Sequence, residues 1–147
     1  MKALTLAQQQ YVETVAELAR TRGRARTADL AKQLGVRPPS VTQAVARLAR
    51  LGLVERRSWH DIALTDRGRG VARRLDTRHH ALRRFLTSVL GMGTATADAN
   101  ACRIEHCVGA PLTDHLAKFV EFYEHDMPAA CKRRWQRRRR TADRGQS

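Results

Sequence analysis

Residues 27–52, TADLAKQLGVRPPSVTQAVARLARLG, set the architecture of the N-terminal part of the chain. Thr27 can cap a short first helix, and Gly35 then supplies a tight turn. Pro38–Pro39 suit the first turn of a second helix, because the amide hydrogens that proline lacks have no intrahelical partners there. The second helix lasts until Gly52. Two short helices joined by a glycine turn predict a helix-turn-helix.

The second helix has an apolar stripe that includes Val41, Val45 and Leu48, and a polar and basic opposite face. We expect the polar face to enter the major groove of DNA, because glutamine can read adenine and arginine can read guanine or bind phosphate. An amphipathic helix with a solvated polar face is the alternative. The expected DNA contacts in this region are Arg37, Pro39, Ser40, Thr42, Gln43 and Arg47.

A polar tip separates two apolar runs, Leu53–Val54 and Ile62–Thr65, which predicts a β-hairpin. A hairpin directly after a recognition helix forms a wing, and Trp59 is placed to pack it onto the body. We expect Arg56 and Arg57 to contact backbone phosphates or the minor groove. Solvated charges on the wing are the competing interpretation.

The rest of the chain is helical by its apolar periodicity. Helices are expected at residues 6–21, from Thr65 or Asp66 to about Leu90, from near Asp98, and from Pro111. The fold class is therefore mainly α, with an N-terminal winged helix-turn-helix (residues 1–70) followed by an all-helical domain (71–130). The helices after the wing carry more apolar surface than one layer can hide, which favours a homodimer and hence a palindromic DNA site.

The net charge of +14 divides between the body and a basic tail that we take as residues 131–147. Clustered like charges cannot bury a core, so this tail is expected to be disordered. A strongly basic chain favours a polyanionic partner, most simply double-stranded DNA, although an anionic membrane surface also fits.

No run of apolar residues is long enough to span a bilayer, and the N-terminus lacks a signal pattern. We therefore expect a cytoplasmic protein without a membrane partner. An odd count of three cysteines does not form a secreted disulfide framework, so they are expected to be free thiols or ligands.

Cys102, Glu105 and His106 stand at i, i+3 and i+4 if their segment is helical. Thiolate, carboxylate and imidazole together suit a divalent transition ion better than calcium or magnesium. A buried cysteine beside a solvated Glu-His pair is the alternative. His79 falls on the apolar stripe of the long helix, where a core role competes with a ligand role.

The order of these features resembles the DtxR/MntR family of metal-dependent transcriptional repressors. The resemblance covers roughly residues 5 to 125, and it implies a DNA-binding domain, a helical dimerisation and metal-binding domain, and a divalent metal as corepressor. The family's SH3-like domain has no counterpart, which implies the shorter, MntR-like architecture. The matching stretches are Ser40–Thr42, Arg47–Leu48, Gly52–Val54, Leu64–Thr65, Gly68, Arg78–His79, Phe85–Leu86 and Ala101–His106.

By this resemblance Glu105 and His106 match the core ligands, and Cys102 stands where iron-responsive members have cysteine and manganese-responsive members have glutamate. Members of the family also have a second, ancillary metal site, and this sequence departs from its pattern at two positions. Arg83 replaces an acidic residue, and Asp98 stands where some iron regulators have histidine. The implied ligand set is Cys102, Glu105, His106, His79, Glu13, Gln10 and Asp98. Gln10 and Glu13 lie on the polar face of the first helix, and the alternative for them is that this face is only exposed to solvent.

The expected function is metal-dependent repression of metal-homeostasis genes. A thiolate ligand favours iron(II), with manganese(II) second and cobalt, nickel or zinc as further options. The alternative is a winged-helix regulator that senses an organic ligand or an oxidant through its cysteine thiols. A nonspecific DNA coater fits the charge but not the ligand cluster. An enzyme is not expected, because no metalloprotease motif, phosphate loop or nucleophile triad is present.

Overall fold

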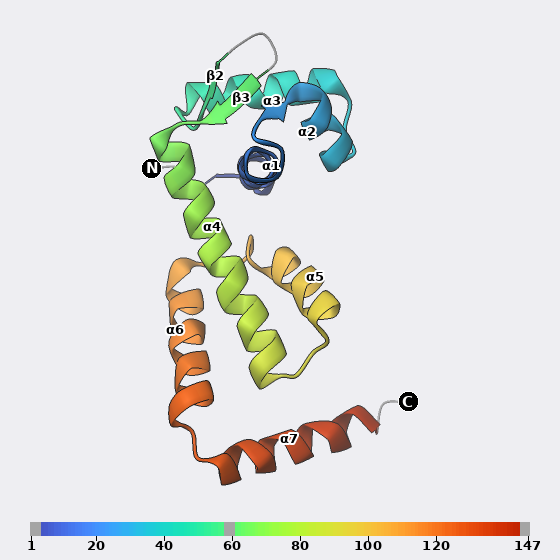
Figure 1. The fold of residues 1–147 in the computed structure, drawn as a ribbon, viewed down its shortest axis with the longest axis vertical. Helices are drawn as coiled ribbons and strands as arrows, with labels where there is room; N and C mark the ends of the chain where they lie inside the picture. Colours follow the sequence, from blue (N-terminus) through green and yellow to red (C-terminus); the bar gives the residue numbers. More distant parts are fainter. Residues whose placement is uncertain (1–3, 58–60, 145–147) are drawn as a thin grey trace. The chain divides into compact units, whose positions relative to one another are not determined.

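The computed structural model describes residues 4–57 and 61–144, and it is mainly helical with one small sheet, as predicted (Figure 1). The chain divides into two compact units after Asp76. This is later than the boundary expected at residue 70, because the long helix α4 (Asp66–Arg84) begins in the first unit and continues into the second. No helix among the described residues is long and apolar enough to cross a membrane.

The N-terminal unit combines a helix-turn-helix with an antiparallel wing. Thr5 caps its first helix in a capping box with Gln8. The strand order is β1-β3-β2, and Val54 pairs with Leu64 across the wing. The elements are α1 (Leu6–Arg22), β1 (Ala25–Arg26), α2 (Thr27–Leu34), α3 (Pro38–Arg50), β2 (Val54–Arg56) and β3 (Asp61–Leu64).

In the N-terminal unit the predicted helices and hairpin are confirmed, with one addition, and Arg26 rather than Thr27 is the N-cap of α2. The two-residue strand β1 was not expected, because it is too short to show a strand pattern in the sequence. The structure reveals it through the burial of Ala25 and its pairing with Ile62. The turn between α2 and α3 uses Gly35 at a φ of 64°, where side chains are strained. Trp59, expected to pack the wing, lies outside the described residues.

One apolar core of the N-terminal unit orients α3. Leu18 of α1, Leu30 of α2 and Leu48 of α3 are fully buried in one cluster. Each such side chain contributes about 1.5–3 kcal/mol by leaving water. Because Val41 and Val45 join the same cluster, the opposite face of α3 points to solvent.

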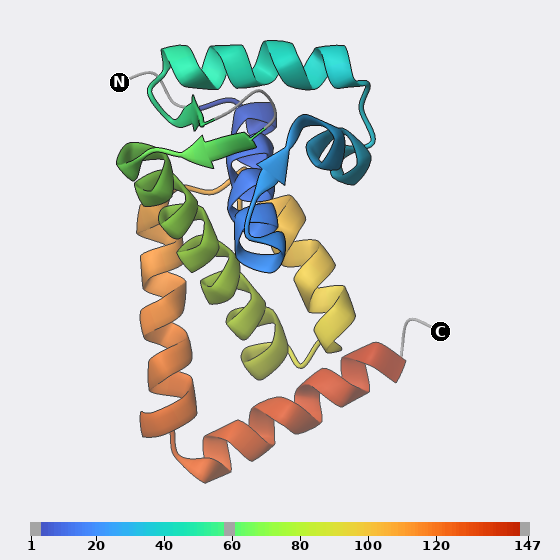
Figure 2. The same ribbon diagram turned by 45° about the horizontal axis from the view of Figure 1, so that its top comes forward.

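In the C-terminal unit two helices flank the continuation of α4 on two sides (Figure 2). The last turn of the long helix is π-helical, since the Leu90 amide donates to the Phe85 carbonyl. Leu82 and Leu86 pack there against Ala97 and Ala101. The elements after α4 are η1 (Phe85–Val89), α5 (Thr94–Ile104), α6 (Ala110–Glu121), η2 (Phe122–Asp126) and α7 (Ala129–Arg144).

The expectation of a disordered tail from residue 131 is wrong as far as Arg144, because α7 is a helix. Arginine, lysine and glutamine are good helix formers. Tertiary contacts also hold the helix: the Trp135 indole donates to the Val89 carbonyl at 2.6 Å, and the Lys132 ammonium donates to the Glu124 carbonyl at 2.7 Å. Residues 145–147 lie outside the described part.

Candidate metal centre

The end of α5 brings three different donor groups together. Helical geometry continues through Glu105, whose amide donates to the Ala101 carbonyl at 2.9 Å. Cys102 and Glu105 therefore stand in the predicted i, i+3 helical relation, and His106 follows in the turn at the end of the helix. Their sulfur, oxygen and nitrogen ligand atoms all lie within 4.8 Å of one another.

Burial within this cluster is uneven. The Glu105 and His106 side chains are 3% and 4% exposed, and Cys102 is exposed. The carboxylate oxygen Oε1 of Glu105 lies 3.6 Å from Nε2 of His106. A buried carboxylate is costly unless a cation or a hydrogen-bond donor compensates it. The cluster thus joins a buried acid and imidazole to a thiol at the surface.

His79 on α4 connects two carboxylates. Its Nδ1 lies 3.0 Å from Oε2 of Glu105, and its Nε2 lies 3.0 Å from Oδ1 of Asp98. A neutral imidazole carries one N–H and donates to one of these groups, whereas an imidazolium donates to both. His79 therefore orients Glu105, and it must release one of these two carboxylates to bind an ion through that nitrogen.

The environment of His106 favours its metal-binding form. Burial lowers the pKa of His106, and the nearby charge of His79 lowers it further. Only the neutral imidazole has a lone pair for a metal ion. The lowered pKa consequently widens the pH range in which His106 can act as a ligand.

The remaining predicted ligands are placed differently. The structure brings His79 and Asp98 to the cluster, but Gln10 and Glu13 belong to α1 in the N-terminal unit, so their role stays a prediction. Arg83 is half-buried on α4. The donor set of the C-terminal unit fits a divalent transition ion, because nitrogen and sulfur ligands suit such ions better than calcium or magnesium.

All eight predicted DNA contacts are exposed. On α3 the Thr42 hydroxyl donates to the Pro38 carbonyl at 3.2 Å, and on the wing the Arg57 guanidinium pairs with Glu55 at 3.1 Å. These side chains are Arg37, Pro39, Ser40, Thr42, Gln43, Arg47, Arg56 and Arg57. Their exposure meets the first requirement for groove and phosphate contacts, and DNA contact itself stays a prediction.

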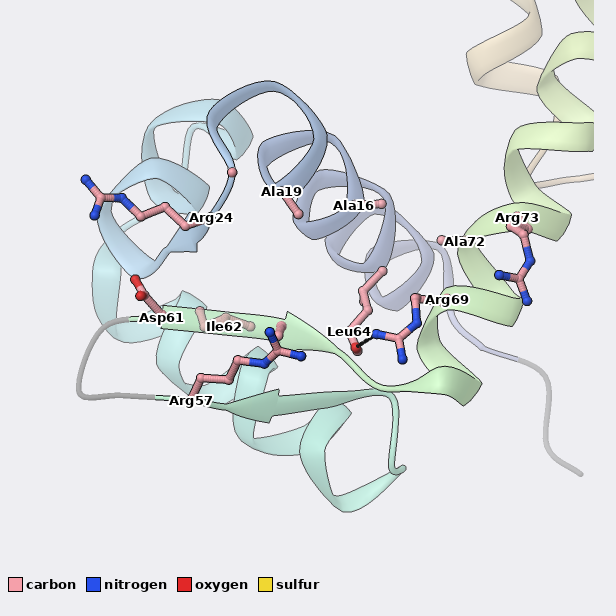
Figure 3. A pocket seen from close by; sticks show the side chains of 12 residues that line it. Ala16, Ala19, Arg24, Arg57, Asp61, Ile62, Leu64, Arg69, Ala72 and Arg73 are labelled. Carbon is pink, nitrogen blue, oxygen red and sulfur yellow. Dashed lines mark hydrogen bonds between the residues drawn. The ribbon is translucent and has the colours of Figure 1, made fainter.

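A concavity of about 470 Å³ lies on the N-terminal unit between α1, β3 and the start of α4 (Figure 3). Alanines such as Ala16 and Ala72 leave the space open, and guanidinium groups stand around it. One of these, Arg69, donates to the Leu64 carbonyl at 2.6 Å. No local sequence pattern indicated this pocket, because its arginines come from three segments that are separate in the sequence.

Two family profiles together match most of the chain. The profile described as "Iron dependent repressor, N-terminal DNA binding domain" matches residues 3–58. The profile described as "Iron dependent repressor, metal binding and dimerisation domain" matches residues 65–131.

Individual proteins similar in sequence to this chain are transcriptional regulators. The transcriptional regulator MntR of Escherichia coli O157:H7 is 36% identical over 111 residues, which cover 76% of this chain and 71% of the relative. An uncharacterized HTH-type transcriptional regulator of Methanocaldococcus jannaschii is 32% identical over 99 residues, covering 67% and 79%.

Solved structures share the fold, and this chain spans about half the length of the two described next. T. acidophilum IdeR superposes with a TM-score of 0.69 at 24% identity, over 80% of this chain and 55% of that one. A manganese-dependent transcriptional repressor in complex with manganese superposes with a TM-score of 0.69 at 27% identity, over 78% and 53%. The chain belongs to the DtxR/MntR family of metal-dependent transcriptional regulators.

Proposed function

We propose that this protein is a repressor that uses a divalent transition metal as corepressor and controls metal-homeostasis genes in the cytoplasm. The observation that carries the proposal is the cluster of Cys102, Glu105 and His106, whose ligand atoms lie within 4.8 Å of one another. The exposed polar face of α3, in the same chain, supports DNA as the target.

Each residue of the centre has a distinct role in this proposal. Cys102, Glu105 and His106 hold the ion, while His79 orients Glu105 and Asp98 orients His79. The family resemblance adds Gln10 and Glu13 of α1 to the proposed ligands. An ion held by these residues would act as corepressor by binding the DNA-competent form of the protein better and so shifting the population towards that form.

The Cys102 thiol determines which metals we expect to be preferred. Manganese favours oxygen-rich ligand sets, whereas thiolate and imidazole raise the preference for later ions. We therefore place iron(II) first and manganese(II) second, with cobalt, nickel or zinc as further ions that the donor set accepts. Availability in the cell decides among them.

The protein acts as a homodimer on a palindromic operator in this proposal. Leu112, Phe119 and Phe122 are exposed and lie at spacings that share one face of α6 and η2. An apolar face of this kind is typical of a contact with a second copy of the chain. Two copies present two recognition helices, which matches two half-sites.

The experiment uses the operator recovered by selection from random duplexes with metal-loaded protein. Metal is expected to raise operator affinity by roughly tenfold or more in the wild type. His106→Ala abolishes this gain but keeps salt-sensitive nonspecific binding. His125→Ala removes an exposed histidine of the same unit and should behave as wild type. Full metal activation of His106→Ala would contradict the proposal.

The pocket of Figure 3 favours one second candidate, a regulator that senses an organic anion. Its alanine side chains suit the apolar part of a ligand, and guanidinium groups such as those of Arg57 and Arg69 suit a carboxylate or phosphate. Such a protein would bind its operator equally well with and without a chelator. That result separates the two functions.

A further inference from the structure

One face of α7 is held against the C-terminal unit by its own side chains. Lys132, Trp135 and Arg139 recur at i, i+3 and i+7, so they share a face. Lys132 donates to the Glu124 carbonyl at 2.7 Å, and Trp135 and Arg139 donate to the Val89 carbonyl at 2.6 and 3.3 Å. Three donors thus fix the orientation of the helix about its axis.

The turn after η1 is shaped to admit this contact. Gly91 has a φ of 62°, and a Cβ at this position would overlap the guanidinium of Arg139. The Lys132 ammonium also lies 5.8 Å from the centre of the Tyr123 ring, within the range of a cation–π contact. The glycine at residue 91 is therefore compatible with a docked α7.

Among the residues of α7 whose side chains the structure describes, four arginines lie on the side away from the docked face. Arg133, Arg134, Arg137 and Arg138 stand at i, i+1, i+4 and i+5, and all four are exposed. We call these four residues the arginine face. The helix rises by about 7.5 Å from Arg133 to Arg138, which is the length of the arginine face. A DNA duplex carries about four phosphates over that length, so the charge densities match.

We propose that the arginine face is a second DNA-contacting surface, which binds the phosphate backbone without sequence preference. The proposal rests on the proposed function only for its choice of DNA as the polyanion. An anionic bilayer is a poorer match, because the arginine face has no apolar side chain to insert and Trp135 is turned to the Val89 carbonyl. Phosphate contacts need only the charges.

The test uses the full-length protein with excess chelator and a duplex of about 40 base pairs without the operator. The variant R133Q/R134Q removes two charges from the arginine face while keeping helix propensity. The matched control, R103Q/K118Q, removes two exposed charges elsewhere in the same unit. Circular dichroism checks that both variants keep the wild-type helix content. Affinity is measured from low to high salt.

The logarithm of the affinity should fall less steeply with the logarithm of salt in R133Q/R134Q, by about 0.9 for each phosphate that is no longer neutralised and hence about 1.8 per chain. The control should keep the wild-type slope. Equal slopes in the two variants would overturn the proposal. So would tighter binding of wild type to a duplex RNA, or to phosphatidylglycerol vesicles, that depends on the same two arginines more than DNA binding does.

Because chelator is present throughout, this result is independent of the metal centre. A protein whose operator binding ignores metal, but whose slope changes in R133Q/R134Q, would refute the proposed corepressor and retain the arginine face. The opposite pair of results would retain the corepressor and refute the arginine face.

Discussion

Replacing Glu105 by glutamine should separate metal binding from folding. Glu105 is 3% exposed, and glutamine keeps its volume and an acceptor oxygen for Nδ1 of His79 while removing the charge. Because the desolvation cost of a buried charge disappears together with its attraction to His79, the metal-free variant should be as stable as wild type to within about 1 kcal/mol. An ion beside residue 105, in contrast, loses its anionic ligand.

The expected size of the metal-induced rise in Tm follows from the linkage between metal binding and folding. At a metal concentration one hundredfold above Kd, the ion stabilises the native state by about 2.7 kcal/mol. For a unit of about 70 residues each kcal/mol moves Tm by about 4–8 °C. Wild type should therefore gain about 10–20 °C with saturating metal. A hundredfold loss of affinity would remove nearly all of this gain from Glu105→Gln.

The assay is thermal unfolding by circular dichroism, with chelator and then with iron(II) or manganese(II) under anaerobic conditions. Glu121→Gln is the matched control, since it removes an exposed carboxylate of the same unit. It should keep the full metal-induced shift. A Glu105→Gln variant that gains as much from metal as wild type would refute the assignment of Glu105 as a ligand.

Three further predictions concern other parts of the molecule. A hydrogen bond from Ser88 lowers the pKa of Glu124 from its usual value of 4.5. The stability that this carboxylate contributes is therefore present above that pH and is lost as the pH falls through the lowered pKa. The variant Ser88→Ala should consequently show a smaller fall in Tm between about pH 5 and pH 3. Gly91→Ala should destabilise the unit by about 1 kcal/mol or more in urea unfolding, because its φ is strained and Arg139 must move. Arg47→Ala should weaken operator binding by about 1–3 kcal/mol in titrations, while a uniform loss on all duplexes would assign it to phosphate.

Local signals predicted the winged helix-turn-helix well. The prolines at the start of α3 and the glycine after α2 act within a few residues of their own position, so they can be read directly from the sequence. The strand β1 lacks such a signal, because its two residues are extended only through pairing with β3. The helix α7 was missed for a related reason: Lys132 and Trp135 donate to the backbone carbonyls of Glu124 and Val89, and no sequence pattern identifies such contacts.

The candidate site shows the same division. Helical spacing alone predicted that Cys102, Glu105 and His106 share a patch. Spacing did not predict that His79 holds Glu105 and Asp98 at once, because that contact depends on how α4 packs against α5. The family resemblance supplied those residues as ligands. The structure shows in addition that His79 is hydrogen-bonded to both Glu105 and Asp98.

Binding of a divalent transition metal by Cys102, Glu105 and His106 is the property on which the proposed function depends. It is measured by an anaerobic titration of chelator-stripped protein with iron(II) and manganese(II) in turn, following the number of ions bound per chain and their affinity. We expect saturable binding of at least one ion per chain that is weakened roughly tenfold or more in Cys102→Ala. Binding in wild type no stronger than in Cys102→Ala would contradict the assignment of the metal centre.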